Sequence, residues 1–246
     1  MESKKSEAVI LRTRDFGESD LMVTAFSYLY GNIKGIAKGA RRSSKRFVNS
    51  LNILSLVNLA FKERRNSDLV WIDSCELIDG YPGIRSDYNI LSNASYLIEM
   101  TEILFPENVQ NIELFNLLRF ALSALSTKQD PEEILIISQA QAMRIGGFGI
   151  NLSKCSICGR SYKGEGRALF NPSSGSLICM ACDKETPLRP GLDPDSVHFL
   201  EMIQSPGISL PDNLHLNERI LKELKRVLRL HVEQHLGRRL QSSKYI

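Results

Sequence analysis

Hydrophobic and polar positions alternate along the first third of the chain, between about residues 7 and 79. Alternation with a period of two, together with many β-branched residues, is typical of strands that bury one face. Turn-forming residues such as Gly17, Gly31 and Asn66 separate the alternating stretches. The pattern predicts five strands, at residues 7–15, 21–28, 32–39, 51–61 and 69–78. Five short strands within eighty residues indicate a small barrel, either OB-type or SH3-like.

After Tyr81 the apolar period lengthens to that of helices, over residues 88–104, 112–126 and 131–146. Asp87 and Asp130 are expected N-caps, and Gly146 lies at an expected helix end. Two more helices are predicted at residues 193–204 and 216–240, packing back on the first three. We therefore expect an α+β multidomain protein with a barrel at 1–80, a helical bundle at 81–150, a cysteine-rich insert at 151–190 and C-terminal helices at 191–246.

The insert contains two Cys-x-x-Cys pairs separated by 20 residues, formed by Cys155, Cys158, Cys179 and Cys182. This spacing allows two turns to present four thiolates to one zinc ion. Four cysteines close the coordination shell, so the predicted zinc is structural rather than catalytic. A chance arrangement, a redox pair and an iron–sulfur cluster are the alternatives. The fifth cysteine, Cys75, lies in an apolar strand-like stretch and is expected to be buried.

A cluster of cations occupies the middle of the barrel region, where residues 21–62 contain no aspartate or glutamate. On the strand pattern, the first two of these cations share one face of the third strand, and the rest lie on a mobile loop at the barrel mouth. Such a patch is expected to bind DNA phosphates, although a solvated loop is the simpler alternative. The expected DNA contacts are Lys34, Lys38, Arg41, Arg42, Lys45 and Arg46.

Four aromatic side chains near this cluster are candidates for base stacking, although aromatic residues in strands more often fill a core. They are Phe26, Tyr28, Tyr30 and Phe47.

The last predicted helix segregates its cations from its apolar side chains. This cationic stripe, continued by Arg238 and Arg239, is either a second contact, for DNA or for an acidic peptide, or a solvated helix face. Its members are Lys222, Lys225, Arg226 and Arg229. On the same helix, His231 and His235 lie one turn apart, and packing or capping is their expected role.

Composition narrows the functional classes only a little. The 246 residues carry a net charge of +3, which by itself does not indicate nucleic acid. The N-terminus has no apolar leader and no long apolar run follows, so a cytoplasmic protein without a membrane span is expected. An odd number of cysteines in two close pairs suits metal binding in a reducing compartment. The catalytic motifs of nucleotide-binding enzymes, serine hydrolases, zinc proteases and zinc deaminases are missing, so no enzymatic activity is expected.

Several short segments resemble the RecO family of bacterial recombination mediators along nearly the whole chain. The resemblance begins at residues 8–12, 17–20 and 37–41, and continues through residues 114–118. It includes the paired cysteines, with Phe170 and Gly175 between them, and the closing residues 235–242. The chain departs from the family at residues 51–53, where a proline-containing stretch is usual, and at residues 174–176, where a double glycine is more usual.

This resemblance implies a fold and a function. It implies an N-terminal OB barrel, a helical C-terminal domain and a zinc site that only some members have. It also implies a protein of the RecF pathway that acts after DNA damage by binding single- and double-stranded DNA and annealing complementary strands. The implied partners are RecR, for loading recombinase onto coated strands, and the C-terminal tail of single-strand-binding protein. Arg119 and Arg144 are the expected tail contacts, and the implied location is the nucleoid.

A second hypothesis belongs to a different class. The chain would then be a zinc-ribbon adaptor that assembles a protein complex through its helices without touching DNA. The two hypotheses differ in whether alanine at the basic loop lowers affinity for oligonucleotides and flattens its salt dependence.

Overall fold

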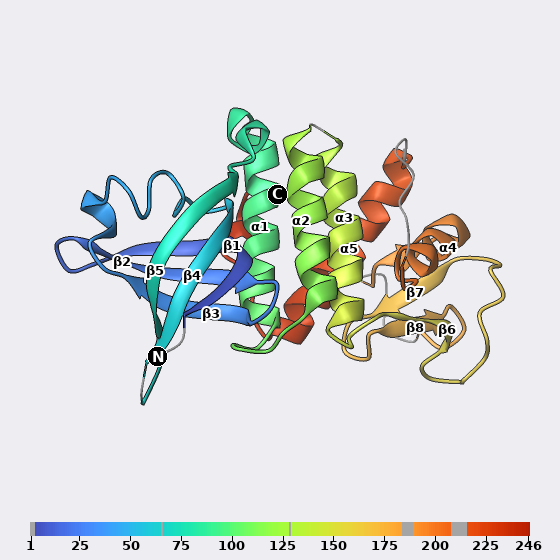
Figure 1. Cartoon of the computed structure of the whole chain (residues 1–246). Helices are drawn as coiled ribbons and strands as arrows, with labels where there is room; N and C mark the ends of the chain where they lie inside the picture. Colours follow the sequence, from blue (N-terminus) through green and yellow to red (C-terminus); the bar gives the residue numbers. More distant parts are fainter. Residues whose placement is uncertain (1–2, 65, 128, 184–188, 208–215) are drawn as a thin grey trace. The chain divides into compact units, whose positions relative to one another are not determined.

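A computed structural model describes residues 3–64, 66–127, 129–183, 189–207 and 216–246 of the chain (Figure 1). The chain forms two compact units. The first comprises residues 1–129 together with residues 242–246, and the second comprises residues 130–241. This boundary falls inside the segment 81–150, so compactness gives two units where the sequence pattern suggests four segments. As a statement about separate domains, the four-part division stays a prediction.

Five strands of the first unit close into a barrel in the order β1-β2-β3-β5-β4. All neighbours are antiparallel except β3 and β5, which are parallel, and β4 pairs with β1 to complete the circle. This is the strand arrangement of an OB barrel. The OB-type prediction is confirmed, and the SH3-like alternative is set aside. The strands are β1 (Lys4–Phe16), β2 (Asp20–Ser27), β3 (Gly31–Ala37), β4 (Leu56–Arg64) and β5 (Ser67–Asp79).

Alternate residues of each strand fill the barrel, as the period of two requires. Ile10, Val23 and Leu59 are among the buried core residues, and Cys75 joins them, which confirms its predicted burial. Gly35 faces this core where β3 meets β5. A Cβ atom there would lie 2.7 Å from a methyl group of Val70, so the parallel pair closes only with glycine.

The fourth strand begins at Leu56 rather than at the predicted residue 51. Asn49 and Leu54 have φ angles of 53° and 71°, in the left-handed region that interrupts a strand. Leu51 and Leu54 are nevertheless buried, because this segment folds over the barrel. Burial in a loop therefore imitated the apolar pattern of a strand.

Two helices of the first unit follow the barrel: α1 (Tyr88–Leu104) and α2 (Ile112–Ser126), after the short 3₁₀ helix η2 (Pro82–Ser86). The carboxylate of Asp87 accepts hydrogen bonds from the first turn of α1, which confirms the predicted cap. The ring of Phe115 on α2 stacks on Phe26 of β2 at 6.4 Å. The outer face of this strand is thereby covered by a helix.

In its described residues, the second unit combines three helices with a small sheet in the order β6-β8-β7-β9. Apolar residues of one sheet face, among them Phe170 and Leu177, share a buried cluster with Leu200 and Leu228 of the helices. Its elements are α3 (Pro131–Ile145), β6 (Asn151–Cys155), β7 (Ala168–Asn171), β8 (Ser176–Cys179), β9 (Gly191–Leu192), α4 (Pro194–Ile203) and α5 (Glu218–Leu236). The predicted N-cap at Asp130 is confirmed, since its carboxylate accepts from the amides of Glu132 and Glu133.

The last long helix is shorter than predicted. It ends at Leu236 because Gly237 adopts a φ of 62°, the left-handed conformation of a helix C-cap. Arg238 and Arg239 therefore lie outside α5 and do not continue its cationic stripe, which corrects the sequence-based prediction. The chain then returns to the first unit through η3 (Ser242–Lys244), where Ser242 donates from its amide and its hydroxyl to Glu99.

Candidate metal centre and nucleic-acid interface

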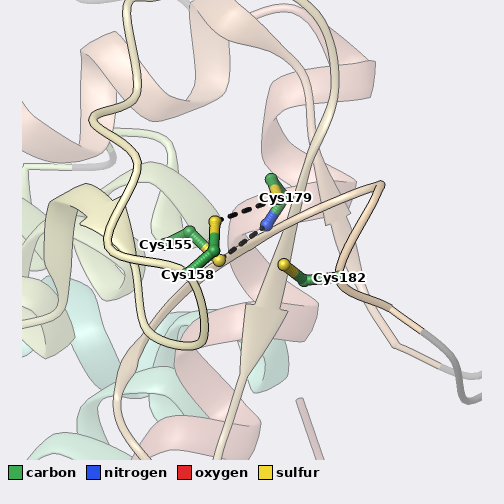
Figure 2. Close-up of side chains that lie close together, drawn as sticks. All are labelled: Cys155, Cys158, Cys179 and Cys182. Carbon is green, nitrogen blue, oxygen red and sulfur yellow. Dashed lines mark hydrogen bonds between the residues drawn. The ribbon is translucent and has the colours of Figure 1, made fainter.

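The four paired cysteines meet at one end of the small sheet. Strands β6 and β8 run parallel, and each ends on a cysteine, Cys155 and Cys179 respectively. Parallel strands bring their C-terminal ends to the same edge, so both Cys-x-x-Cys turns start side by side. The four sulfur atoms lie within 4.8 Å of one another (Figure 2).

Each turn is closed by its own backbone. In the first, the amide of Gly159 donates to the carbonyl of Cys155, and Gly159 has a φ of 71°. In the second, the amide of Cys182 donates to the carbonyl of Cys179 at 3.0 Å. These turns aim the two sulfurs of each pair toward the other pair.

Backbone amides also point at one sulfur. The amides of Ile157 and Cys179 each lie 3.4 Å from Sγ of Cys155 (Figure 2 draws the second). Desolvation raises the pKa of this thiol, but donation from the surrounding amides outweighs it and lowers the pKa to about 6. Hydrogen bonds with Cys158 and Cys179 raise the pKa of Cys182 to about 12. The cluster therefore favours a thiolate at Cys155 and a thiol at Cys182.

The sulfur cluster fits a zinc ion. Four sulfurs at the usual Zn–S distance of about 2.3 Å lie about 3.8 Å apart in a tetrahedron. The distance between Sγ of Cys158 and Sγ of Cys179 is 3.8 Å, and the cysteines are not joined by disulfides. The apolar cluster beside them contains only Cys155, Leu169 and Ile178 among its buried residues within the described chain. The residues present can bind a metal ion at a place where apolar packing is thin.

The basic segment of the barrel is anchored, whereas the sequence suggested a mobile loop. It begins with the 3₁₀ helix η1 (Ala40–Arg42), where the amide of Gly39 donates to the carboxylate of Asp20. Farther along, Phe47 and Leu51 are buried in the barrel core. The amide of Cys75 donates to the carbonyl of Arg46, which joins the segment to β5. The cations therefore lie on a fixed surface.

Carboxylates from other parts of the first unit reach some of these cations. Lys34 pairs with Glu107, and Arg41 lies 3.4 Å from Asp15. The stretch without acidic residues in the sequence is thus not free of acidic partners in space. By contrast, Arg42 and Lys45 are exposed and have no carboxylate within ion-pair distance in the described part of the chain.

Arg46 has a structural contact. Its guanidinium donates to the carbonyl of Lys38 at 2.7 Å and to that of Asp73 at 3.3 Å. It thereby joins the end of β3 to β5. Lys38 is exposed, and its ammonium lies 4.1 Å from the ring centroid of Trp71. Of the six predicted cations, Lys38 and Arg46 are joined directly, through the hydrogen bond from the guanidinium of Arg46 to the backbone carbonyl of Lys38.

The cations of the α5 stripe also differ in whether a carboxylate pairs with them. Lys225 lies 2.8 Å from Glu132 of α3, so its charge is paired within the second unit. Lys222 and Arg226 are exposed, and Arg229 is half-buried. The exposure of Lys222 and Arg226 therefore does not distinguish a DNA contact from a solvated helix face.

The four predicted stacking aromatics are engaged in packing. Phe26 and Tyr28 contact Phe115, with ring centroids 6.4 and 5.4 Å apart, and Phe47 is buried. Tyr30 meets Phe61 edge-on at 5.3 Å. The core interpretation, weighed against stacking from the sequence, agrees with these contacts.

Three residues of the barrel surface were missed: Trp71 on β5, and Lys62 and Arg64 on β4. Strand alternation carries the signal that would have found them, because their neighbours Phe61, Val70 and Ile72 face the core. The sequence placed Trp71 in an apolar run and therefore in no functional group.

The two histidines of α5 pack against aromatic rings. His231 is buried, donates from Nε2 to the carbonyl of Phe148 at 2.5 Å, and meets His235 at 4.5 Å between centroids. Burial lowers the pKa of His231 to about 4. Within the described residues, the cysteine cluster is the group assembled with metal-binding geometry.

An OB barrel and a four-cysteine ribbon in one chain define a class of proteins that combine a nucleic-acid-binding fold with a metal-binding module. Two family models match, Recombination protein O N terminal over residues 1–81 and Recombination protein O C terminal over residues 85–244. The chain belongs to the RecO family, and its role lies in DNA repair and recombination.

Individual relatives are similar to the chain along nearly their whole length. The chain is 30% identical to the DNA repair protein RecO of Syntrophus aciditrophicus over 245 residues, covering 98% of this chain and 94% of the relative. It is likewise 30% identical to that of Anaeromyxobacter dehalogenans (strain 2CP-1), covering 100% of this chain and 96% of the relative. The similarity therefore spans the barrel, the helices and the ribbon. No helix in the described part of the chain has both the length and the apolarity to cross a membrane.

Proposed function

We propose that this protein is a recombination mediator that binds single- and double-stranded DNA and anneals complementary strands. The observation that carries the proposal is the fixed basic segment on an OB barrel, in a chain whose family acts in DNA repair. OB barrels bind single strands through a charged face and adjoining loops. The contacts are those expected from the sequence, with Arg42 and Lys45 as the most available of them.

Annealing needs no covalent step. Two strands repel each other through their phosphates, and cations that neutralise part of this charge lower the barrier to pairing. Arg42 and Lys45 supply such charge with no carboxylate at ion-pair distance among the described residues, whereas Arg46 acts by holding β3 and β5 together. The stripe of α5 would offer a second strand a separate surface. The protein accordingly acts by binding, with no enzymatic turnover.

The metal that we assign to the cysteine cluster is structural zinc. Four cysteine ligands leave no coordination position for an activated water. The ion would hold the two turns together, and its chemistry would be limited to that. The N–H donors around Cys155 support this assignment because they favour the thiolate that a metal ion requires.

The partners implied by the resemblance remain part of the proposal. They are RecR and the acidic, apolar C-terminal tail of single-strand-binding protein, with Arg119 and Arg144 as expected tail contacts. Arg119 is half exposed and lies 3.7 Å from Glu7, and Arg144 donates to the side-chain oxygen of Gln141. A cytoplasmic, nucleoid-associated location is the matching expectation.

The test removes charge without disturbing the barrel. We predict that the double variant Arg42→Ala/Lys45→Ala binds single-stranded DNA more weakly and has a flatter salt dependence. Each phosphate contact contributes about 0.7 to the slope of log affinity against log salt for a single strand. Loss of two contacts should lower the slope by about 1.4. Fluorescence anisotropy of a labelled oligonucleotide between low and moderate salt measures both quantities.

A matched control removes the same charge from the other unit. The variant Arg160→Ala/Lys163→Ala alters two exposed cations of the ribbon and should leave the slope unchanged. Annealing of complementary oligonucleotides, bare or coated with single-strand-binding protein, should slow only in the barrel variant. Equal slopes in both variants would contradict the assignment of the basic segment.

The adaptor hypothesis has one observation in its favour. Ile157 and Met180, at the tips of the two cysteine turns, are 61% and 59% exposed. Exposed apolar side chains of this kind suit a protein partner. If the wild-type protein failed to bind oligonucleotides at low ionic strength, this second function would replace the first.

A further inference from the structure

Trp71 lies half-buried on the outer face of the barrel, between cations from two neighbouring strands. The ammonium of Lys38 lies 4.1 Å from its ring centroid, and the guanidinium carbon of Arg64 lies 4.4 Å from it. Lys38 directly follows β3, and Arg64 ends β4, while Trp71 lies on β5. One aromatic ring therefore has positive charge from both flanking strands.

Backbone pairing fixes the position of this ring. In the register of the sheet, Trp71 is opposite Ile36 of β3 and Lys62 of β4. Its sequence neighbours Val70 and Ile72 are buried in the barrel core, so Trp71 must point outward. A side chain held on a central strand with neighbours on both sides loses little further freedom when a ligand binds.

The charges around the ring are also ordered. Asp73, two residues along the same strand face, is neutralised by Lys62 at 2.7 Å. Arg46 donates to the carbonyls of Lys38 and Asp73, which holds the basic segment next to this face. The carboxylate is thus compensated. In the described part of the chain neither Lys38 nor Arg64 has a carboxylate within ion-pair distance, although the charge of Lys38 helps to lower the pKa of Asp20.

From this arrangement we infer that Trp71 stacks an unpaired base of single-stranded DNA while Lys38 and Arg64 contact the adjoining phosphates. This inference rests on the proposed function and names one of its contacts. Stacking a base on an aromatic ring is worth more than a cation over an exposed ring, so a base can replace a cation on the ring face. The displaced cation stays within reach of the backbone that carries the base.

The contact distinguishes single strands from duplex. Bases of a duplex are stacked on one another and present no face to a side chain, so Trp71 can act only on unpaired bases. Phosphate contacts, by contrast, serve both forms of DNA. Trp71 would therefore set the preference of the barrel for single strands, and pairing of the bound strand would remove that contact.

The chain contains a single tryptophan, so its fluorescence reports this contact directly. Titration with oligothymidylate should quench the fluorescence of the wild-type protein along the same binding curve as the anisotropy of a labelled oligonucleotide. Titration with a duplex of equal length should give the anisotropy change with much less quenching. The proposal is overturned if single strands bind by anisotropy and leave the tryptophan emission unchanged.

Variants provide the second measurement. Trp71→Leu retains apolar bulk and removes the aromatic face, and should weaken single-strand binding by about 5- to 100-fold. Duplex affinity should stay within about twofold, because the phosphate contacts remain. Trp71→Phe should recover part of the loss. Tyr88→Ala, which removes an exposed aromatic ring elsewhere in the first unit, is the matched control and should change neither affinity.

The outcomes separate this inference from the proposed function. Equal affinity of wild type and Trp71→Leu for single strands would overturn the stacking role and leave DNA binding in place. Equal losses for single strands and duplex would also overturn it, because they indicate a structural role for Trp71. Absence of all DNA binding by the wild-type protein would contradict the proposed function itself.

Discussion

The barrel and the cysteine ribbon are both small β-structures, but they are held together by different interactions. The barrel closes on itself, and among the described residues its core contains fifteen buried side chains. The cysteine side of the ribbon has three such residues, one of which is itself a candidate metal ligand. Apolar burial is sufficient to stabilise the first region, whereas the second needs another source of free energy.

This difference in apolar burial explains where each region places its functional groups. Because the barrel core holds the strands firmly, the outer face can carry a half-buried tryptophan and cations that have no carboxylate at ion-pair distance among the described residues. The ribbon instead places its four candidate metal ligands, the cysteines, on the two turns that close it. Its opposite sheet face packs on helices through residues such as Phe170 and Leu177, so the proposed metal would be needed on one side only.

Removal of the metal should have the largest effect of all, and it should affect the ribbon while leaving the barrel unchanged. Structural zinc contributes about 10–16 kcal/mol of apparent binding free energy in isolated fingers, which exceeds the stability of many domains. We expect about one zinc ion per chain, and we expect a strong chelator to unfold residues 151–182 locally. Hydrogen exchange measured by mass spectrometry should show lost protection there and unchanged protection in the barrel strands.

Cysteine variants give the matched control for that experiment. Cys158→Ser should lose the metal as chelation does, whereas Cys75→Ala, which alters the buried cysteine of the barrel, should retain it. Retention of full zinc content by Cys158→Ser would contradict the assignment of the metal to the four cysteines. Loss of barrel protection on chelation would contradict the conclusion that the barrel is stabilised by apolar burial.

The converse change acts on the barrel core. Leu59 is completely buried among the core residues of the barrel, so Leu59→Ala should lower the free energy of unfolding by about 3–5 kcal/mol. Leu77→Ala, at a site 41% exposed, should change it by less than about 0.5 kcal/mol. Denaturant titration measures both, and zinc content should be the same in the two variants. A metal-dependent effect of Leu59→Ala would mean that the units are not independently stabilised.

A smaller effect should distinguish the units by pH. Burial lowers the pKa of His231 from 6.5 to about 4, so the unfolded chain takes up this proton at a higher pH than the folded protein. The resulting stability is fully present above pH 6.5 and is lost as the pH falls toward 4. The shift corresponds to about 3 kcal/mol, and all four histidines lie in the second unit.

Comparison with His231→Gln isolates this contribution. Glutamine keeps a donor for the carbonyl of Phe148, and the variant should lose less stability than wild type between pH 6.5 and 4. His235→Gln, at the exposed neighbour, should retain the wild-type dependence. Because every variant keeps the four cysteines, acid release of zinc affects all of them equally. Parallel stability curves for wild type and His231→Gln would contradict the assignment.

Much of the fold could be predicted because it is encoded locally. The period of two located all five barrel strands, and the helical period located α1 and α2 at their observed bounds. Local chemistry also explains the caps at Asp87 and Asp130. Errors occurred at Leu51, where a buried loop has the apolar pattern of a strand, and at Arg238, where a glycine ends the helix earlier than the apolar pattern predicts. The basic segment was also expected to be mobile, but distant contacts anchor it.

The candidate sites also differ in whether they depend on local or on long-range contacts. The metal centre was predictable because each pair of cysteines is joined by a short turn, and the spacing alone restricts where the four sulfurs can meet. The pairing of Lys34 with Glu107, and of Arg41 with Asp15, was not predictable. These partners lie far apart in the sequence, and only the folded chain brings them together.

By itself, then, the sequence determined the strands, the helices, the cysteine cluster and the family, because periodicity and short-range spacing act over a few residues. The tertiary structure decided which cations remain unpaired and that Trp71 lies between Lys38 and Arg64. Those contacts depend on barrel closure through the parallel pairing of β3 with β5, which places distant strands next to each other. The sequence determines which side chains are charged, but the fold determines which groups lie next to them.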